Sequence, residues 1–190
     1  MATAILGGIL IGGSSSRMGQ PKHLCQIDGR TFFERVVAAL QPHVDQVVAI
    51  GAGELPAAPA GSTRLDDVAG VRGPLAGILA ALRWRSDATW LVAACDLPFV
   101  TPAAIAWLLA QAAPDRAAVI PRIDDRGVEP LLALYTPRIG SAVEQLVAAS
   151  VRGPCKLVEL PDVHCPQVPP ELVDCWRNVN EPDDLDWRGR

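Results

Sequence analysis

The chain has 190 residues, 49% of them apolar, and a formal net charge of −4. This length and composition predict a single globular domain over 1–190, and the negative charge argues against broad binding to nucleic acid. No apolar run approaches the roughly 18 residues that cross a bilayer, so we expect no membrane association. Five cysteines, an odd number, favour reduced thiols. The apolar segment near the start is short and lacks the basic leader that a signal peptide would have. Both observations lead us to expect a cytoplasmic location.

Apolar runs of strand length alternate along the chain with longer segments of helical period. This alternation is typical of α/β proteins in which helices cover a mostly parallel sheet. Helix starts are marked by a capping box of Thr31 with Glu34 and by prolines after Gly73, Thr101 and Thr136. The expected strands are 4–11, 46–51, 90–95, 117–121 and 131–135, and the expected helices are 32–41, 74–84, 102–112 and 137–149.

Two stretches rich in proline, glycine or alanine interrupt this alternation. They cover 51–64 and the residues around 161–170. Such compositions favour irregular backbone, so we expect both stretches to be loops without regular structure.

The loop after the first expected strand has the sequence LIGGSSSRMGQPK from Leu10 to Lys22. Its glycines and serines permit close backbone approach to a ligand, and Arg17 and Lys22 add two cations, which together suit a polyphosphate. Neither GxxxxGK[ST] nor GxGxxG is present. The spacing resembles the signature GG-x-S-x-R-M-G-x-x-K of nucleotidyltransferases with a Rossmann-like fold. The alternative interpretation of this loop is an ordinary surface turn between a strand and a helix.

Acidic residues follow two of the expected apolar segments. Asp96 ends the run WLVAAC, and a carboxylate at the carboxyl end of a buried strand suits Mg²⁺, although turn aspartates are also common there. Asp66 and Asp67 precede GVRGPLAGI, in which Gly73 and Pro74 open a helix that can attract an anion. One of these two acids can orient Mg²⁺ or bond a nucleotide hydroxyl, and we expect Asp67 to be a solvated turn residue.

Five segments resemble, in the same order, the molybdenum cofactor guanylyltransferase family: LIGGSSSRMGQPK, DDVAGVRGPLAGI, CDLP with Phe99, EPLLALY and NVNEPDDL. The resemblance implies a three-layer, Rossmann-like nucleotidyltransferase fold with helices on both faces of the sheet. It also implies Mg²⁺-dependent transfer of GMP from GTP to the phosphate of Mo-molybdopterin, with pyrophosphate released. The implied protein partners are transient ones, which insert molybdenum or accept the finished cofactor.

The resemblance assigns roles to individual residues. It implies a guanosine pocket formed by Leu10, Ile11, Gly12 and Gly13, with Asp66 as a nucleotide-binding aspartate. Lys22 would hold phosphate, Arg17 is the arginine of the motif, and Asp96 would bind both Mg²⁺ and nucleotide, so these three form the expected catalytic group. The cations available for the pterin substrate are Arg72, Arg122, Arg126, Arg152 and Lys156.

Two departures from the family pattern leave the choice of nucleotide open. Ile11 stands where the family usually has alanine, and Gly51-Ala52-Gly53 stands where some members offer an asparagine to the base. The alternatives are cytidylyl or other nucleotidyl transfer to molybdopterin or to a sugar or isoprenoid phosphate. A non-catalytic module that binds and delivers a nucleotide is a further alternative.

Overall fold

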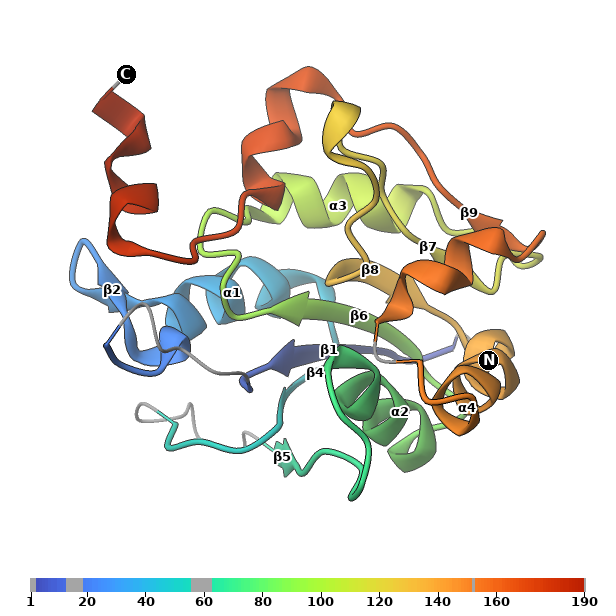
Figure 1. The fold of residues 1–190 in the computed structure, drawn as a ribbon. Coiled ribbons are helices and arrows are strands. Elements are labelled where there is room, and N and C mark those ends of the chain that lie inside the picture. Colours follow the sequence, from blue (N-terminus) through green and yellow to red (C-terminus); the bar gives the residue numbers. More distant parts are fainter. Residues whose placement is uncertain (1–2, 13–18, 56–62, 152, 190) are drawn as a thin grey trace.

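The computed structural model describes residues 3–12, 19–55, 63–151 and 153–189. Among these residues, seven strands form one sheet in the order β5-β4-β1-β6-β8-β7-β9 (Figure 1). The strands are β1 Ile5–Leu10, β4 Gln46–Ile50, β5 Thr63–Leu65, β6 Thr89–Ala94, β7 Ala118–Val119, β8 Leu132–Tyr135 and β9 Val163–His164.

The sheet is parallel except at one strand. β5, β4, β1 and β6 all pair in parallel, whereas β8 runs antiparallel to both β6 and β7, and β9 is again parallel to β7. Leu10 is level with both Ile50 and Ala94, so three parallel strands end side by side. The prediction of a mostly parallel sheet is confirmed.

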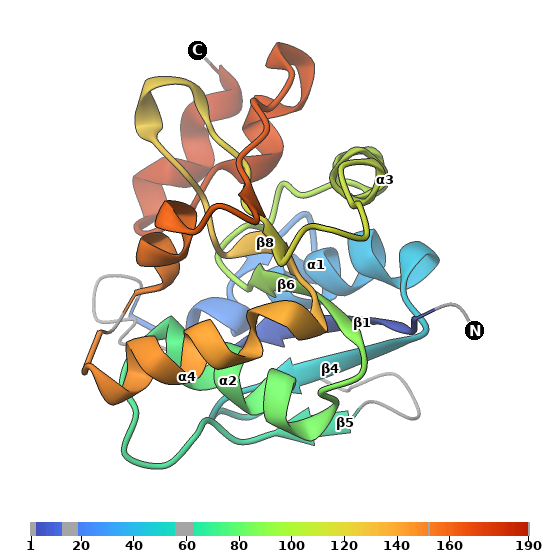
Figure 2. The ribbon, with the colours of Figure 1, turned by 90° about the vertical axis from the view of Figure 1, so that its right-hand side faces the viewer.

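Helices cover both faces of the sheet, as Figure 2 shows. α1 Phe32–Leu40 and α3 Pro102–Ala110 pack on one face, and α2 Pro74–Trp84 and α4 Gly140–Ala148 pack on the other. Each layer has its own apolar cluster against the sheet. Because β1, β4 and β6 are covered on both sides, their sequences are nearly continuous apolar runs, and the expected three-layer architecture is confirmed.

The predicted helix starts are present. Thr31 Oγ1 accepts a hydrogen bond from Glu34 N at 3.1 Å while Glu34 Oε2 accepts one from Thr31 N at 2.7 Å, which completes the capping box. Thr101 Oγ1 likewise accepts from Ala104 N at 3.3 Å at the start of α3. The helix predicted over 137–149 begins with a separate 3-10 turn, η4 Pro137–Ile139, before α4.

Short elements account for most differences from the sequence predictions. β5 includes Thr63 and Arg64 of the expected loop 51–64, and β9 lies within the expected loop around 161–170, so both loop predictions were partly wrong. Strands of two or three residues carry too little periodicity to detect. The other unpredicted elements are the hairpin of β2 Gln26–Ile27 with β3 Arg30–Thr31, and η1 Lys22–Leu24, η2 Gln41–His43, η3 Asp124–Arg126, η5 Pro154–Glu159, η6 Pro170–Trp176 and η7 Pro182–Gly189.

Among the described residues, every helix is too short or too polar to span a membrane.

Candidate active site

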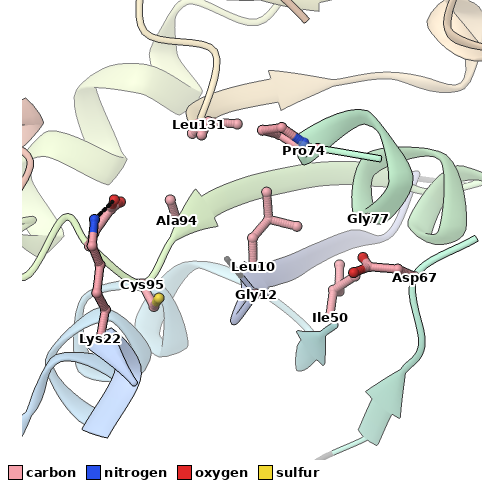
Figure 3. Close-up of a pocket in the computed structure, with 12 residues that line it drawn as sticks. Leu10, Gly12, Lys22, Ile50, Asp67, Pro74, Gly77, Ala94, Cys95 and Leu131 are labelled. Atoms are coloured by element: carbon pink, nitrogen blue, oxygen red, sulfur yellow. Dashed lines mark hydrogen bonds and ion pairs between the residues drawn. The ribbon is translucent and has the colours of Figure 1, made fainter. Parts of the chain in front are cut away.

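A hollow of about 330 Å³ opens beyond the carboxyl ends of β1, β4 and β6, and we call it the first hollow. This is the edge at which open α/β sheets bind ligands, because strand ends and helix N-termini meet there. Figure 3 shows Lys22 at one side of it and Asp67 at the other, with Leu10 and Ala94 between them. Its lining residues are Leu10, Gly12, Lys22, Ile50, Asp67, Gly73, Pro74, Gly77, Ala94, Cys95, Asp96 and Leu131.

An ion pair closes one side of the first hollow. Lys22, the first residue of η1, donates through Nζ to Asp96 Oδ2 at 2.9 Å, and Asp96 stands two residues after the end of β6 at Ala94. The two side chains are only 19% and 22% exposed, so their attraction is screened less than that of a surface pair. The structure therefore brings together two of the three residues expected to be catalytic.

The other carboxylate oxygen of Asp96 is suited to a metal ion. Asp96 Oδ1 is buried, and it has no hydrogen-bond partner within the described parts of the chain. A buried oxygen without a donor is unfavourable, and a hard cation is one way to satisfy it. Because the described residues include no group of three His, Cys, Asp or Glu that could hold a metal, Mg²⁺ here would take its other ligands from phosphate and water, as it often does.

Asp67, and not Asp66, belongs to the first hollow. The Asp66 side chain is 90% exposed, with a carboxylate oxygen 3.9 Å from Nη2 of Arg64, and it does not line the hollow. Asp67 is an exposed residue, as expected, but it also lines the first hollow, which was not expected. The nucleotide-binding role that the resemblance implies for Asp66 stays a prediction. The two side chains point in different directions at the end of β5, and without that strand in the prediction their directions could not be assigned.

The environment of Asp67 changes its acidity. Partial burial, followed by the nearby carboxylate of Asp66, raises the pKa of Asp67 above the ordinary value of 3.8. A carboxylate at this position can accept hydrogen bonds from the hydroxyl or N–H groups of a ligand in the hollow.

The residues expected to form the guanosine pocket divide into three groups. Leu10 and Gly12 line the first hollow, whereas Ile11 is buried in the cluster that packs against α1. Gly13 lies outside the described residues, as does Arg17. Leu10 at the end of β1 and Gly12 just beyond it therefore reach the hollow, but the Ile11 side chain packs away from it.

Gly77 of α2 lines the first hollow and packs closely on the ends of β1 and β4. A Cβ at this position of α2 would lie 2.6 Å from Cδ2 of Leu10 and 3.1 Å from Cγ2 of Ile50. At these separations a side chain at position 77 would require the terminal groups of Leu10 and Ile50 to shift. Gly77 therefore lets α2 pack closely on the ends of β1 and β4 with these side chains as they are.

The C-terminal segment also reaches the site. Asn180 Oδ1 accepts a hydrogen bond from Lys22 Nζ at 2.6 Å, and Val179 N donates to the carbonyl oxygen of Asp96 at 2.8 Å. The pattern NVNEPDDL marks this segment in the sequence, but local pattern gives no partner for a residue 158 positions away. Sequence reasoning therefore missed Asn180.

Glu129 is a second acidic group near Asp96. Its carboxylate accepts hydrogen bonds from Leu131 N at 2.8 Å and Asn178 Nδ2 at 3.3 Å. Burial is the main cause that raises the pKa of Glu129, and the charge of Asp96 adds to it. Glu129 thus connects the start of β8 to the C-terminal segment.

Of the five cations expected to hold the pterin, those within the described residues do not line the first hollow. Arg122 and Arg126 are exposed around η3, and Lys156 is exposed and paired with Glu159 at 2.8 Å. Arg72 borders a separate hollow of about 200 Å³ beside the end of α4. Arg152 lies outside the described residues.

The fold and the site define a class: α/β proteins whose ligand site lies at the carboxyl edge of a mostly parallel sheet, here beside a lysine paired with an aspartate. Comparison with protein families gives the same class in finer detail. The sequence model of the MobA-like NTP transferase domain matches residues 7–163. The chain belongs to this family of nucleotidyltransferases.

Individual relatives agree with this assignment. The chain is 34% identical over 187 residues to the probable molybdenum cofactor guanylyltransferase of Pelotomaculum thermopropionicum, covering 94% of this chain and 89% of the relative. It is 31% identical over 195 residues to the protein of the same name from Halalkalibacterium halodurans, covering 95% of each. The crystal structure of molybdopterin-guanine dinucleotide biosynthesis protein A from Archaeoglobus fulgidus superimposes with a TM-score of 0.76 at 28% identity, covering 96% of this chain and 95% of that one.

Proposed function

We propose that this chain transfers the GMP part of GTP to the terminal phosphate of Mo-molybdopterin, which yields the guanine dinucleotide form of the cofactor and pyrophosphate. The observation that carries the proposal is the contact between Lys22 and Asp96 beside the first hollow, in a chain similar to guanylyltransferases along nearly its whole length. The hollow lies within the size range of small-molecule sites.

The reaction joins two anions. An oxygen of the molybdopterin phosphate attacks the α-phosphorus of GTP, a new P–O bond forms, and the bond from that phosphorus to the β-phosphate oxygen breaks. The bonding electrons leave with pyrophosphate. Because a phosphate monoester is already ionised near neutral pH, the attacking oxygen needs no general base, and the barrier comes mainly from charge repulsion and alignment.

The proposed catalytic residues act on charge and position. Lys22 would donate to oxygens of the transferring and leaving phosphates, together with Arg17 of the same motif, and would stabilise the charge that develops on them. Oδ1 of Asp96 would hold Mg²⁺, which when bound neutralises phosphate charge. Asn180 keeps the Lys22 ammonium group at its position beside Asp96.

The nucleoside would occupy the first hollow. Leu10 and Gly12 supply its floor, with Ile11 and Gly13 contributing backbone, and Asp67 lines it next to Asp66, for which the resemblance implies nucleotide binding. We also propose that the chain acts as a single unit over 1–190. In support, Asn180 contacts Lys22 although it lies outside the part of the chain that matches the family model.

A nucleotide panel tests the proposal. Purified protein is incubated with Mo-molybdopterin, Mg²⁺ and GTP, CTP or ATP, and the dinucleotide product is identified by mass spectrometry while pyrophosphate release is measured. We expect product chiefly with GTP. A preference for CTP would contradict guanylyl transfer, and GTP-dependent thermal stabilisation without product would indicate a delivery module instead.

A further inference from the structure

A short segment near the C-terminus contacts both members of the ion pair, and we call residues 178–180 the crossing segment. Asn180 Oδ1 accepts a hydrogen bond from Lys22 Nζ at 2.6 Å, and Val179 N donates to the carbonyl oxygen of Asp96 at 2.8 Å. The Val179 side chain is fully buried in a small apolar cluster. Because side chains of an extended segment alternate, Asn178 and Asn180 lie on the same side of it.

The Lys22 ammonium group depends on its acceptors for its position. Its four-carbon stem is flexible, and holding the stem in one geometry costs conformational entropy. Asn180 offers a neutral oxygen that holds the ammonium only where the crossing segment itself is held. Since a misplacement of about 1 Å in a catalytic site can cost about 10² in rate, whatever fixes this segment bears on the transfer step.

One end of the crossing segment is held by residues that directly follow it. Asp184 Oδ2 accepts hydrogen bonds from Asn180 N at 2.8 Å and from Glu181 N at 3.2 Å. These bonds are local in sequence, so they set the direction of the backbone after Asn180. They do not set where the segment lies relative to the sheet.

The other end is held by Glu129, which lies 49 positions away in the sequence. Glu129 Oε2 accepts a hydrogen bond from Asn178 Nδ2 at 3.3 Å. Its second oxygen, Oε1, accepts one from Leu131 N at 2.8 Å, and the carbonyl oxygen of Leu131 accepts one from Ala94 N at 2.7 Å. One carboxylate therefore connects the crossing segment to the end of β6, two residues before Asp96.

Glu129 is suited to this connection because a carboxylate has two acceptor oxygens and no donor. It can therefore take N–H groups from two separate segments at once. Its own backbone is also fixed, since Glu129 N donates to the carbonyl oxygen of Pro121 at 2.9 Å. Glu129 does not line the first hollow, so its contacts are with the protein residues around the site.

We propose that Glu129 is a positioning residue for the transfer step. By holding Asn178 it fixes the crossing segment on the sheet, so that Asn180 keeps the Lys22 ammonium beside Asp96. The inference rests on the proposed function, because it requires Lys22 to act on the phosphates of a bound nucleotide. It gives the acidic residue of EPLLALY a role two contacts away from Lys22.

Amide hydrogen exchange, followed by NMR on the full chain, tests the positioning without any substrate. Asn178→Ala removes the bond to Glu129 Oε2 but leaves the bond from Leu131 intact. We expect the Val179 amide to exchange about tenfold faster in this variant, because the crossing segment opens more often from Asp96. The internal control is the Ile11 amide, which donates to the carbonyl oxygen of Ile50 at 2.8 Å in the parallel part of the sheet and should be unchanged.

A double-mutant cycle tests the consequence for turnover. We expect Asn178→Ala to lower kcat by about five- to tenfold with little change in the dissociation constant for GTP. Combined with Asn180→Ala, it should cost hardly more than Asn180→Ala alone, because both substitutions act on the same contact with Lys22.

Substitutions of Glu129 itself complete the experiment. Glu129→Ala should lower kcat at least as much as Asn178→Ala does. Glu129→Gln should restore much of the loss, because its amide can donate to Asn178 Oδ1 once the asparagine amide turns over. Glu144→Ala is the matched control, since it removes an exposed carboxylate paired with Arg83 outside the site, and kcat should be unchanged. If Glu129→Ala does not fold, Asn178→Ala and Glu129→Gln supply the answer.

The outcomes separate this inference from the proposed function. Failure of the wild type to form product from GTP would contradict the proposed function, while the exchange rates still report on the positioning. Unchanged Val179 exchange in Asn178→Ala, or losses of kcat that multiply in the double variant, would overturn the inference alone. A raised KM for Mo-molybdopterin with unchanged kcat would also overturn it, because Asn178 would then hold the second substrate.

Discussion

The two halves of the sheet are built differently. β5, β4, β1 and β6 are parallel, and their ends converge on the first hollow through loops that are close in sequence to the strands. The half that contains β8, β7 and β9 has strands of two to four residues and is completed by 3-10 segments from the end of the chain. Binding groups therefore come from local motifs in the parallel half, while the other half contributes through contacts between distant segments.

The pair that we propose to be catalytic, Lys22 and Asp96, lies where the two halves of the sheet meet. Lys22 and Asp96 belong to the parallel half, but Asn180 and Val179 of the C-terminal segment bond to them. This arrangement indicates that damage to the C-terminal segment should affect the transfer step more than GTP binding. The following predictions test that division.

Loss of Trp176 should have the largest effect. This side chain is buried, its Nε1 donates to the carbonyl oxygen of Leu132 at 3.2 Å, and its ring meets that of Trp107 edge-on at 5.5 Å. We expect Trp176→Ala to lower the free energy of unfolding by about 3–5 kcal/mol, as for other large buried aromatics. Urea denaturation monitored by circular dichroism measures it.

Trp84 provides the matched control in the parallel half. It is 40% exposed at the end of α2, so Trp84→Ala removes a tryptophan with much less buried area. A loss at Trp84 as large as that at Trp176 would contradict the expectation that the burial of Trp176 makes it the more stabilising of the two.

Removal of either partner of the ion pair should reduce turnover strongly. We expect Lys22→Ala and Asp96→Ala each to lower kcat by about 10²–10³, as when one electrostatic stabiliser of a transition state is removed. Steady-state pyrophosphate release measures it, with thermal melting to establish that the variants are folded. Asp87→Ala is the control, because it breaks an exposed pair with Arg85 outside the site, and normal transfer by Asp96→Ala would refute its role.

Asn180→Ala should separate binding from transfer. It removes one hydrogen bond to a charged group, so we expect kcat to fall by about tenfold while GTP affinity changes much less. Turnover and calorimetric binding of GTP are measured side by side, with the exposed neighbour substituted in Glu181→Ala as the control. Equal losses in both measurements would indicate that the C-terminal segment contributes to nucleotide binding instead.

Substitution of Asp67 should change the stability least of all, and the direction of this change follows from its raised pKa. Its raised pKa means that the folded chain binds this proton more tightly than the unfolded chain does. Stability contributed by this group is therefore present below the ordinary pKa of 3.8 and is lost as the pH rises through the raised value. Asp67→Asn should remove that loss and stabilise the protein near neutral pH, by about 0.5 kcal/mol or less because solvent screens this group.

Thermal melting across pH measures the Asp67 effect. The difference between Asp67→Asn and the wild type should grow as the pH rises from acid to neutral. A difference that shrinks over this range would mean that the carboxylate is stabilised in the fold.

The contrast between the halves also explains what the sequence could predict. The sequence predicted β1, β4 and β6 because continuous apolar runs between capped helices are a strong signal. It pointed to Lys22 and Asp96 because Lys22 ends the loop after the first of these runs and Asp96 follows the run of β6. Asn180 and Glu129 were not assigned roles, because their contacts depend on chain segments far apart in sequence. That Asp67 lines the first hollow was not predicted, because β5 has only three residues and gives too little pattern to assign side-chain directions after it.

A crystal structure of the chain with GTP and Mg²⁺ tests the central claim most directly. We expect the guanosine in the first hollow beside Asp67, the triphosphate at Lys22 and the metal ion on Asp96. A first hollow without nucleotide in crystals that hold GTP elsewhere, or a metal ion bound away from Asp96, would contradict the account.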